Sequence, residues 1–384
     1  MTPGRPKPRT CVTRLAPYVP GRPIEEVEAR YGIRGAVKLA SNENPLGPSP
    51  RAIEAGMRAL FGVNRYPDGS GTLLKHALSA RYGVPPGQIV LGAGGSELID
   101  MTIRTYVEPG EEVLAPKGIF RMFAVATERA GGTLVEVPSP FAGLKPDLPA
   151  LRRRISEKTK VVAIANPNNP TGTYVPREEL EPFLREVPEH VLVFLDEAYF
   201  EFADGVVPDY PDGRTYLGGP HAMVVLRTFS KISGLAGLRI GYGFASPDVA
   251  AALEKVREPF NTSSVAQAAA LAALSDDEHR YRTRALVVEE RDFLFREILV
   301  RDLNPWPSVA NFLLVEIPVL FAPLEPEFTR RGVILRPMAG WGFPNAFRVS
   351  VGTHGENLRF LAALDDVRSQ GLLRTPEVAA VATP

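Results

Sequence analysis

The pattern of apolar and polar positions divides the chain into alternating strand-like and helix-like segments. Apolar runs with little period-two alternation, such as residues 161–165 and 191–195, are typical of strands that are covered on both faces. Ser49 followed by Pro50 is a favourable helix start, because the hydroxyl caps the helix and proline needs no amide partner. We expect helices at 50–61, 70–82, 96–107, 119–130, 177–186, 247–257, 264–274, 277–300 and 355–370, and strands at 88–92, 112–116, 133–138, 160–165, 191–196, 222–227, 239–245, 312–316, 333–335 and 347–351.

The order of these elements predicts the fold class. Strands that alternate with helices indicate an α/β domain with a mainly parallel sheet flanked by helices. After about residue 258, long helices followed by brief strands indicate a smaller α+β domain. We therefore expect an N-terminal arm and small-domain segment (1–40), a large domain (41–258) and a small C-terminal domain (259–384). The length of 384 residues agrees with two or three domains.

Composition and charge exclude several kinds of partner. The 44 basic and 44 acidic residues balance, so no net field attracts nucleic acid. No apolar run reaches the roughly 20 residues that cross a bilayer, and residues 1–10 lack the apolar core of a secretory signal. Cys11 is the only cysteine, so no internal disulfide forms, which fits the cytoplasm. We expect a cytoplasmic protein with no membrane or nucleic-acid partner.

The most informative side chain is Lys231, in Arg-Thr-Phe-Ser-Lys at residues 227–231. An isolated lysine is usually a solvated surface residue. Here the apolar run 224–226 before it and the small, glycine-rich segment after it favour an inward position. A site for pyridoxal phosphate (PLP) needs an amine, a partner for the pyridine nitrogen, a phosphate cradle and a ring wall. Lys231 could supply the amine as a Schiff base.

Three polar side chains follow strands, where open α/β sheets bind ligands. Asp196 closes the run 191–195 and could keep the pyridine nitrogen protonated, although a helix-cap or turn aspartate is an equally open interpretation. Tyr199 could hydrogen-bond the ring's 3-hydroxyl oxygen, with a packing tyrosine as the alternative. Asn169 lies in Asn-Pro-Asn-Asn-Pro-Thr-Gly at 166–172, where its amide could donate to the same oxygen while the segment forms a tight turn.

A phosphate cradle is expected at residues 92–97, Gly-Ala-Gly-Gly-Ser-Glu, which follow a strand and open a helix. Bare amides at a helix N-terminus suit a dianion, although such turns also occur without a ligand. Thr228, Ser230 and Arg239 could complete this cradle, with Arg239 as the charged member.

Two aromatic side chains are further candidates. Tyr66 could add a hydroxyl from a neighbouring subunit, and Phe120 could stack on the cofactor, although a core phenylalanine is its ordinary interpretation. Other chemistries find no support. The five histidines, at positions 76, 190, 221, 279 and 354, show no zinc-like spacing, so we expect no metal. No Gly-x-Ser-x-Gly elbow indicates a serine hydrolase.

With these motifs the chain resembles fold-type I PLP enzymes and, within them, class I/II aminotransferases, over about residues 14–370. More narrowly, it is similar to histidinol-phosphate aminotransferases. The motifs that carry the narrower likeness are Leu-Ala-Pro-Tyr at 15–18, Lys-Leu-Ala-Ser-Asn-Glu-Asn-Pro-Leu-Gly at 38–47, Arg-Tyr-Pro at 65–67, Leu-Arg-Pro at 335–337 and Phe-Arg-Val-Ser-Val-Gly-Thr at 347–353.

The resemblance implies a role for each candidate residue. Lys231 would be the Schiff-base lysine and proton shuttle, and Asp196 would pair with the pyridine nitrogen. Tyr66 would reach the partner's cofactor, which makes a homodimer the expected unit. The remaining implied contacts are Asn169 and Tyr199 to the ring oxygen, Gly95, Ser96, Ser230 and Arg239 to the phosphate, Arg348 to the glutamate carboxylate, Arg348 or Arg336 to the substrate phosphate, and Tyr18 and Asn44 at the substrate mouth.

The implied activity is a ping-pong transamination in histidine biosynthesis. It interconverts histidinol phosphate and 2-oxoglutarate with imidazole-acetol phosphate and glutamate. Rivals on the same scaffold are an aromatic-amino-acid aminotransferase and a threonine-phosphate decarboxylase. A non-catalytic PLP-binding regulator is more remote, because residues 1–40 hold no helix-turn-helix pattern. The segment 117–123 departs from the family pattern, since Phe123 stands where a tyrosine is expected, and this bears on the substrate contacts.

Overall fold

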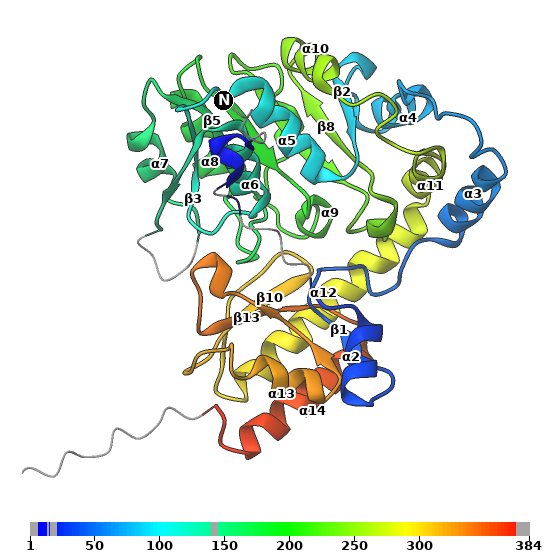
Figure 1. Cartoon of the computed structure of the whole chain (residues 1–384), viewed down its shortest axis with the longest axis vertical. Helices are drawn as coiled ribbons and strands as arrows, with labels where there is room; N and C mark the ends of the chain where they lie inside the picture. The colour runs from blue at the N-terminus through cyan, green and yellow to red at the C-terminus, as the bar shows by residue number, and fades with distance from the viewer. Residues whose placement is uncertain (1–6, 14, 16–20, 140–144, 374–384) are drawn as a thin grey trace, which may run out of the picture. The chain divides into compact units, whose positions relative to one another are not determined.

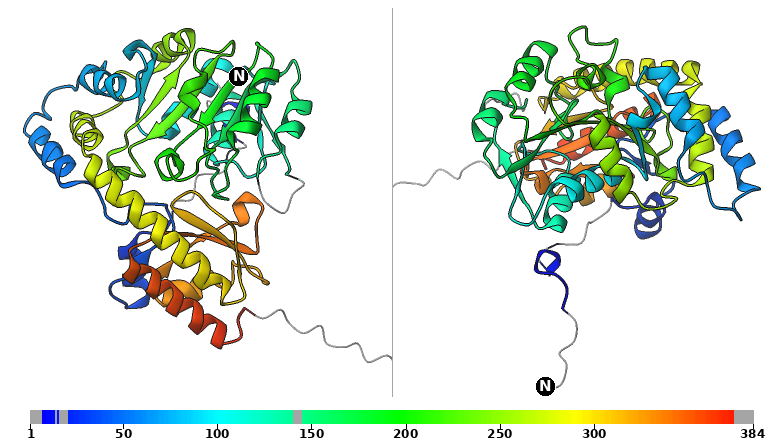
Figure 2. Two further views of the ribbon diagram at one scale, coloured as in Figure 1. Left: turned by 180° about the vertical axis from the view of Figure 1, so that it is seen from behind. Right: turned by 90° about the horizontal axis from the view of Figure 1, so that it is seen from above.

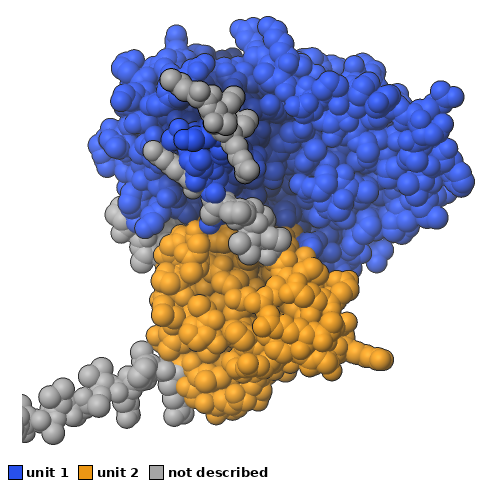
Figure 3. All heavy atoms as spheres, viewed as in Figure 1, with its two compact units in different colours: residues 1–19, 43–286, 308–310 blue, residues 20–42, 287–307, 311–384 orange. Residues whose placement is uncertain are grey.

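The computed structural model describes residues 7–13, 15, 21–139 and 145–373 (Figure 1). They form two compact units, coloured separately in Figure 3. The first unit holds the described residues of 1–19, 43–286 and 308–310, and the second those of 20–42, 287–307 and 311–384. The predicted domain division, with its boundary after residue 258, stays a prediction. Residues 259–286 lie in the first compact unit.

The first unit is built on a seven-stranded sheet with the order β2-β8-β7-β6-β5-β3-β4. Neighbouring strands from β4 to β7 run parallel, whereas β8 is antiparallel to both β2 and β7. The strands are β2 (Ile89–Gly92), β3 (Glu112–Pro116), β4 (Thr133–Val137), β5 (Thr159–Ala165), β6 (Leu192–Asp196), β7 (Met223–Thr228) and β8 (Gly241–Ala245). The prediction of a mainly parallel sheet is confirmed.

Each face of this sheet carries its own apolar core, and Figure 2 shows the helices that cover the two faces. One core includes Phe194 of β6 and Leu226 of β7, and the other includes their strand neighbours Leu195 and Val225. The first core is completed by α5 (Gly95–Tyr106), α6 (Met122–Ala130) and α10 (Pro247–Val256), and the second by α4 (Thr72–Tyr82), α7 (Leu148–Arg154), α8 (Arg177–Glu186) and α11 (Ser264–Leu274), with α3 (Pro50–Leu60) packed on α11. Coverage of both faces explains why these strands lack polar alternation.

The second unit is smaller and mixes helices with short strands, as predicted. Its main sheet has the antiparallel order β12-β13-β10-β9, and a separate parallel pair joins β1 to β11. Its core includes the ring of Phe347, whose centroid lies 5.0 Å from that of Phe321 and 6.1 Å from that of Phe360. The elements are β1 (Val37–Lys38), β9 (Asn304–Pro305), β10 (Phe312–Glu316), β11 (Val333–Ile334), β12 (Arg336–Pro337), β13 (Ala346–Ser350), α2 (Ile24–Tyr31), α13 (Glu325–Arg330) and α14 (His354–Ser369), and α12 (Asp277–Leu299) contributes its residues from 287 onward.

The sequence pattern predicts the long elements well and misses the short ones. The hydroxyl of Ser49 accepts a hydrogen bond from the amide of Ala52 at 3.1 Å, which confirms the predicted cap of α3. The helices α2, α7 and α13 were not predicted, and they have only 8, 7 and 6 residues. Helices of about two turns or fewer show too little periodicity to be distinguished from a polar loop.

Candidate active site

Lys231 lies in the loop that joins β7 to β8, three residues beyond the last residue of β7. Backbone hydrogen bonds hold this loop closed. The amide of Gly234 donates to the carbonyl of Lys231 at 3.1 Å, and the amide of Ser230 donates to the hydroxyl of Thr228 at 3.1 Å. The Lys231 Nζ lies 5.6 Å from the ring centroid of Tyr199. The structure therefore brings together the predicted amine and one of its predicted aromatic neighbours.

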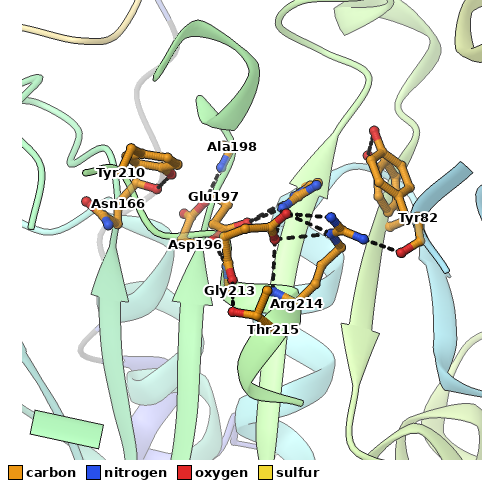
Figure 4. Close-up of polar contacts among 12 residues, drawn as sticks. Tyr82, Asn166, Asp196, Glu197, Ala198, Tyr210, Gly213, Arg214 and Thr215 are labelled. Carbon is orange, nitrogen blue, oxygen red and sulfur yellow. Dashed lines mark hydrogen bonds and ion pairs between the residues drawn. The ribbon is translucent and has the colours of Figure 1, made fainter. Parts of the chain in front are cut away.

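Asp196 ends β6, the strand beside β7, and its Cα pairs with that of Leu226. The side chain is buried and accepts a hydrogen bond from the amide of Ala198 at 3.0 Å (Figure 4). Burial raises the pKa of Asp196 to about 6, against the opposing effects of the Ala198 hydrogen bond and the charge of Lys231. Burial makes the ionised form of this carboxyl group unfavourable, and a cationic partner stabilises that form. A protonated ring nitrogen is such a partner.

A buried ion-pair network lies on the other face of these two strands. Arg227 is fully buried, and its Nε and Nη2 donate to Glu197 Oε2 at 3.0 and 2.8 Å. Its Nη2 also donates to Asp212 Oδ1 at 2.7 Å. Burial opposes the charge of Arg227, but the two carboxylates outweigh this cost and raise its pKa. Arg227 is therefore a permanent cation inside the unit.

The same network fixes the loop that follows β6. Figure 4 shows Glu197 beside Gly213, whose amide donates to Glu197 Oε1 at 2.7 Å. A Cβ at Gly213 would lie 2.7 Å from that oxygen, so only glycine fits. Because successive residues of a strand point to opposite faces, pairing of Glu197 with Arg227 ties the two strand ends on one face and leaves Asp196 and Thr228 on the other. The sequence interpretation missed this role, although a charged residue within the apolar run 223–228 was its signal.

The predicted phosphate turn is assembled by close backbone approach. Gly94 has φ +80°, and a Cβ there would lie 2.5 Å from Arg239 Nη2. A Cβ at Gly241 would lie 3.1 Å from the Gly95 amide nitrogen. Gly95 opens α5, with Ser96 in its first turn. The turn therefore places helix N-terminal amides beside a guanidinium group, which fits a phosphate dianion.

The segment that carries Asn169 is a tight turn, as expected. Asn166 closes it, because its side chain donates to the carbonyl of Val175 at 3.0 Å and accepts from the Val175 amide at 2.8 Å. The Asn166 amide donates to the Asp196 carbonyl at 2.8 Å, which joins the turn to the end of β6. Asn169 itself is buried. Its predicted contact with the cofactor ring stays a prediction.

The aromatic candidates differ in their surroundings. Phe120 follows β3 and is half-buried beside the core. Phe123 is fully buried, and its ring centroid lies 5.2 Å from that of Phe194 in an edge-on arrangement. Phe123, the residue that departs from the family pattern, therefore packs into the core of the first unit. Tyr66 is 83% exposed and stacks on Phe260, with ring centroids 4.7 Å apart.

The substrate candidates are distributed over both units, apart from Tyr18, which lies outside the described residues. In the first unit, Asn44 Nδ2 donates to the carbonyl of Ile232 at 2.8 Å, so its amide supports the segment next to Lys231. In the second unit, Arg336 of β12 and Arg348 of β13 stand directly opposite each other. Arg348 is 5% exposed. Two arginines thus face each other across one antiparallel strand pair.

Comparison with known proteins identifies the family. Residues 34–364 match the family described as aminotransferase class I and II. The chain belongs to the class I and II aminotransferases. It is 49% identical over 354 residues to the histidinol-phosphate aminotransferase of Anaeromyxobacter sp. (strain Fw109-5), covering 92% of this chain and 96% of that protein. It is 46% identical over 356 residues to histidinol-phosphate aminotransferase 1 of Nitrosococcus oceani, covering 93% and 95%.

Solved structures of class I and II aminotransferases share the fold. The histidinol-phosphate aminotransferase of Sinorhizobium meliloti, solved in complex with pyridoxal-5′-phosphate, is 31% identical, with a TM-score of 0.85, and the match covers 94% of this chain and 97% of that one. An aspartate aminotransferase double mutant from Thermus thermophilus is 26% identical, with a TM-score of 0.81, covering 94% and 100%. The expected fold and enzyme class are therefore confirmed.

Two kinds of feature are absent from the described part of the chain. Within it, no helix combines the length and apolar character needed to cross a membrane. The same residues contain no group of three or more histidine, cysteine, aspartate or glutamate side chains arranged to hold a metal ion.

The phosphate turn yields a prediction for Gly94→Ala. The backbone at Gly94, with φ +80° and ψ 173°, is essentially confined to glycine and costs another residue roughly 1–3 kcal/mol, and the new Cβ would displace Arg239. We expect PLP to bind about tenfold more weakly or worse, measured by equilibrium dialysis. Gly87→Ala is the matched control, because a Cβ at Gly87 meets nothing within 4 Å. If the Gly94→Ala protein and this control bound PLP with equal affinity, the turn at residues 92–97 would not form the phosphate site.

Asp196 yields a prediction about pH and stability in protein freed of any cofactor. The unfolded carboxyl ionises near 3.8, whereas the folded one ionises near 6. The stability gained from the protonated folded form is therefore complete below 3.8 and is lost as the pH rises to about 6. Asparagine cannot ionise, so Asp196→Asn should gain up to about 3 kcal/mol relative to the unsubstituted protein across this window. Urea unfolding at a series of pH values measures the difference in the free energy of unfolding between the two proteins. A difference that does not change with pH would contradict the raised pKa of Asp196.

Proposed function

We propose that this class I and II aminotransferase uses PLP to interconvert histidinol phosphate and 2-oxoglutarate with imidazole-acetol phosphate and glutamate, a step of histidine biosynthesis. The observation that carries the proposal is the convergence of Lys231 and Asp196 at the adjoining ends of β6 and β7. The relatives named histidinol-phosphate aminotransferase, which match over nearly the whole chain, support the substrate assignment. The single cysteine agrees with a cytoplasmic reaction.

The residues of the site fit PLP in charge and in shape. Lys231 would bond to it covalently, and Asp196 would pair with its pyridine nitrogen. The absence of a Cβ at Gly94 lets the Arg239 guanidinium group approach the turn that opens α5, and this guanidinium and the first amides of α5 would hold the phosphate of PLP. The proposed contacts of the remaining residues are Gly95, Ser96, Thr228 and Ser230 with the phosphate, Asn169 and Tyr199 with the ring oxygen, and Phe120 with the ring face.

The bound cofactor supplies an electron sink for the bonds at the substrate's α-carbon. The residues of the chain would transfer the proton and orient the cofactor. Lys231 Nζ would take the proton from the substrate's α-carbon, hold it and later give it back. Asp196, in its ionised form, would pair with the cofactor's ring nitrogen and favour the protonated form of that nitrogen. Tyr199, whose ring centroid lies 5.6 Å from Lys231 Nζ, would hydrogen-bond the cofactor's 3-hydroxyl oxygen.

The opposed arginines of the second unit support an anionic substrate. Like charges directly opposite each other on antiparallel strands are destabilising. An anion bound by Arg336 and Arg348 would offset this repulsion, and both proposed substrates carry one, a phosphate or a carboxylate. We therefore assign these two arginines to substrate anions and place Tyr18 and Asn44 at the substrate mouth.

We further propose that the working unit is a homodimer. Exposed apolar side chains cluster in sequence around the exposed Tyr66. They are Ile53, Met57, Leu60, Phe61, Val63 and Leu73, with exposures from 48% to 93%. Exposed apolar side chains that gather on a surface mark interaction sites, so we propose that a second copy covers these residues and receives Tyr66 in its own site.

The substrate assignment is tested by mixing the PLP-loaded enzyme separately with histidinol phosphate, phenylalanine and threonine phosphate. We expect histidinol phosphate to convert the cofactor rapidly to pyridoxamine phosphate, because its phosphate meets the paired arginines. Stopped-flow absorbance measures the rate. Rapid conversion by phenylalanine but not by histidinol phosphate would contradict the assignment in favour of an aromatic-amino-acid aminotransferase. Release of carbon dioxide from threonine phosphate would identify the decarboxylase instead.

A further inference from the structure

The turn at residues 92–97, proposed to hold the cofactor phosphate, is clamped by the side chain of Asn261. This asparagine lies in the segment that joins α10 to α11. Its Nδ2 donates to the carbonyl of Leu91, just before the turn, at 3.1 Å, and to Glu97 Oε2, at the end of the turn, at 2.6 Å. One amide group therefore binds both ends of the turn, across 170 and 164 positions of sequence.

Glu97 carries this contact into the turn itself. Its Oε2 also accepts a hydrogen bond from the amide of Ala93 at 2.5 Å. The amide of Gly94 donates to the carbonyl of Gly92 at 2.7 Å, so the first part of the turn is tightly folded. The Ala93 amide is thus used within the protein. The first amides of α5, which have no partner within the helix, are the donors proposed for the phosphate.

Charged groups on two sides fix the orientation of the Asn261 amide. Arg257 Nη1 donates to Asn261 Oδ1 at 2.8 Å. Arg257 is itself held by Glu254, whose Oε2 accepts from its Nε and Nη2 at 3.0 and 2.8 Å, and Lys75 Nζ donates to Glu254 Oε1 at 2.7 Å. Because a guanidinium group only donates and a carboxylate only accepts, Asn261 presents its oxygen to Arg257 and its NH₂ group to Glu97.

The backbone beside Asn261 is strained, which is an independent observation. Phe260 has φ +58°, in the left-handed region that disfavours residues with a Cβ. A bulky residue keeps such a conformation only where its surroundings hold it, and residues of this kind cluster at functional sites. The ring of Phe260 stacks on Tyr66 at 4.7 Å, and a Cβ at Gly69 would lie 3.3 Å from it. The bonds of Asn261 hold the same backbone from its other side.

We propose that Asn261 is a positioning residue for the cofactor phosphate, an inference that rests on the proposed binding of PLP. Asn261 acts through Glu97. It holds that carboxylate on the Ala93 amide, and the turn keeps the shape in which the first amides of α5 and Arg239 meet a dianion. A Glu97 carboxylate released from Asn261 could turn toward the phosphate, whose charge has the same sign and would be repelled.

The test compares PLP with pyridoxal, which has the same ring and aldehyde but no phosphate. Equilibrium dialysis of the full-length chain, freed of cofactor, measures the affinity for each compound. Asn261→Ala should weaken the binding of PLP by about tenfold or more, because a hydrogen bond to a charged group is lost. The same variant should weaken the binding of pyridoxal by less than about twofold, because the contacts of the ring and the aldehyde come from Asp196 and Lys231.

Glu97→Ala breaks the same bond from its other side, so it tests the inference even where Asn261→Ala disturbs folding. It should show the same selective loss of PLP binding. The double variant should bind PLP within about twofold of the weaker single variant, because two residues that act through one bond are not additive.

Asn304→Ala is the matched control. Asn304 is an exposed asparagine of the second unit, and its Nδ2 likewise donates to a glutamate, Glu316, at 3.0 Å. This variant should bind both PLP and pyridoxal with the affinities of the unsubstituted enzyme.

Three results would overturn the inference while the unsubstituted enzyme binds PLP. The first is equal PLP affinity of Asn261→Ala and Asn304→Ala. The second is an equal loss of PLP and pyridoxal binding in Asn261→Ala, which would indicate general damage to the fold. The third is a double variant whose loss of PLP binding is the product of the two single losses. Failure of the unsubstituted enzyme to bind PLP would contradict the proposed function, and this inference with it.

Discussion

The site depends on one buried interaction, the ion pair of Arg227 with Glu197 and Asp212. A guanidinium group without access to water is tolerable only when carboxylates surround it, and here two of them lie within 3.0 Å. Removal of one partner of such a pair typically costs about 3–5 kcal/mol, because an uncompensated charge stays buried. The three side chains therefore stabilise the unit only as a set, and their strands are held in one register.

The chemistry follows from this constraint. With β6 and β7 tied on one face, Asp196 and the segment from Thr228 to Lys231 have defined positions on the other face. Glycines at positions 94 and 213 then allow contacts closer than a Cβ permits, and the contacts at Gly241 are tighter than most Cβ atoms make. Asp196, a carboxyl group with a raised pKa, therefore lies near the amine of Lys231. With the glycine turn as the proposed phosphate site, these are the groups that PLP binding requires.

Sequence reasoning found the parts of this arrangement that are local. The strand-end aspartate, the lysine loop and the glycine turn each lie within a few residues of a strong apolar run, and the structure places those runs as expected. Sequence reasoning could not predict contacts between segments that are distant in the sequence. Nothing near Arg227 in the sequence reveals its pairing with Asp212, and the bond from Asn44 to Ile232 spans 188 positions. Asn261 is an ordinary polar loop residue in the sequence, and only the fold brings it to Glu97.

The central claim is that Lys231 carries the cofactor, and chemical trapping tests it most directly. Reduction of the PLP-loaded enzyme with borohydride fixes any lysine-bound cofactor, and peptide mass spectrometry then locates it. The account predicts one modified peptide, which contains Lys231, loss of the modification in Lys231→Ala, and its retention in Lys117→Ala. Cofactor trapped on another lysine of the unsubstituted enzyme, or visible absorbance of lysine-bound cofactor that persists in Lys231→Ala, would contradict it.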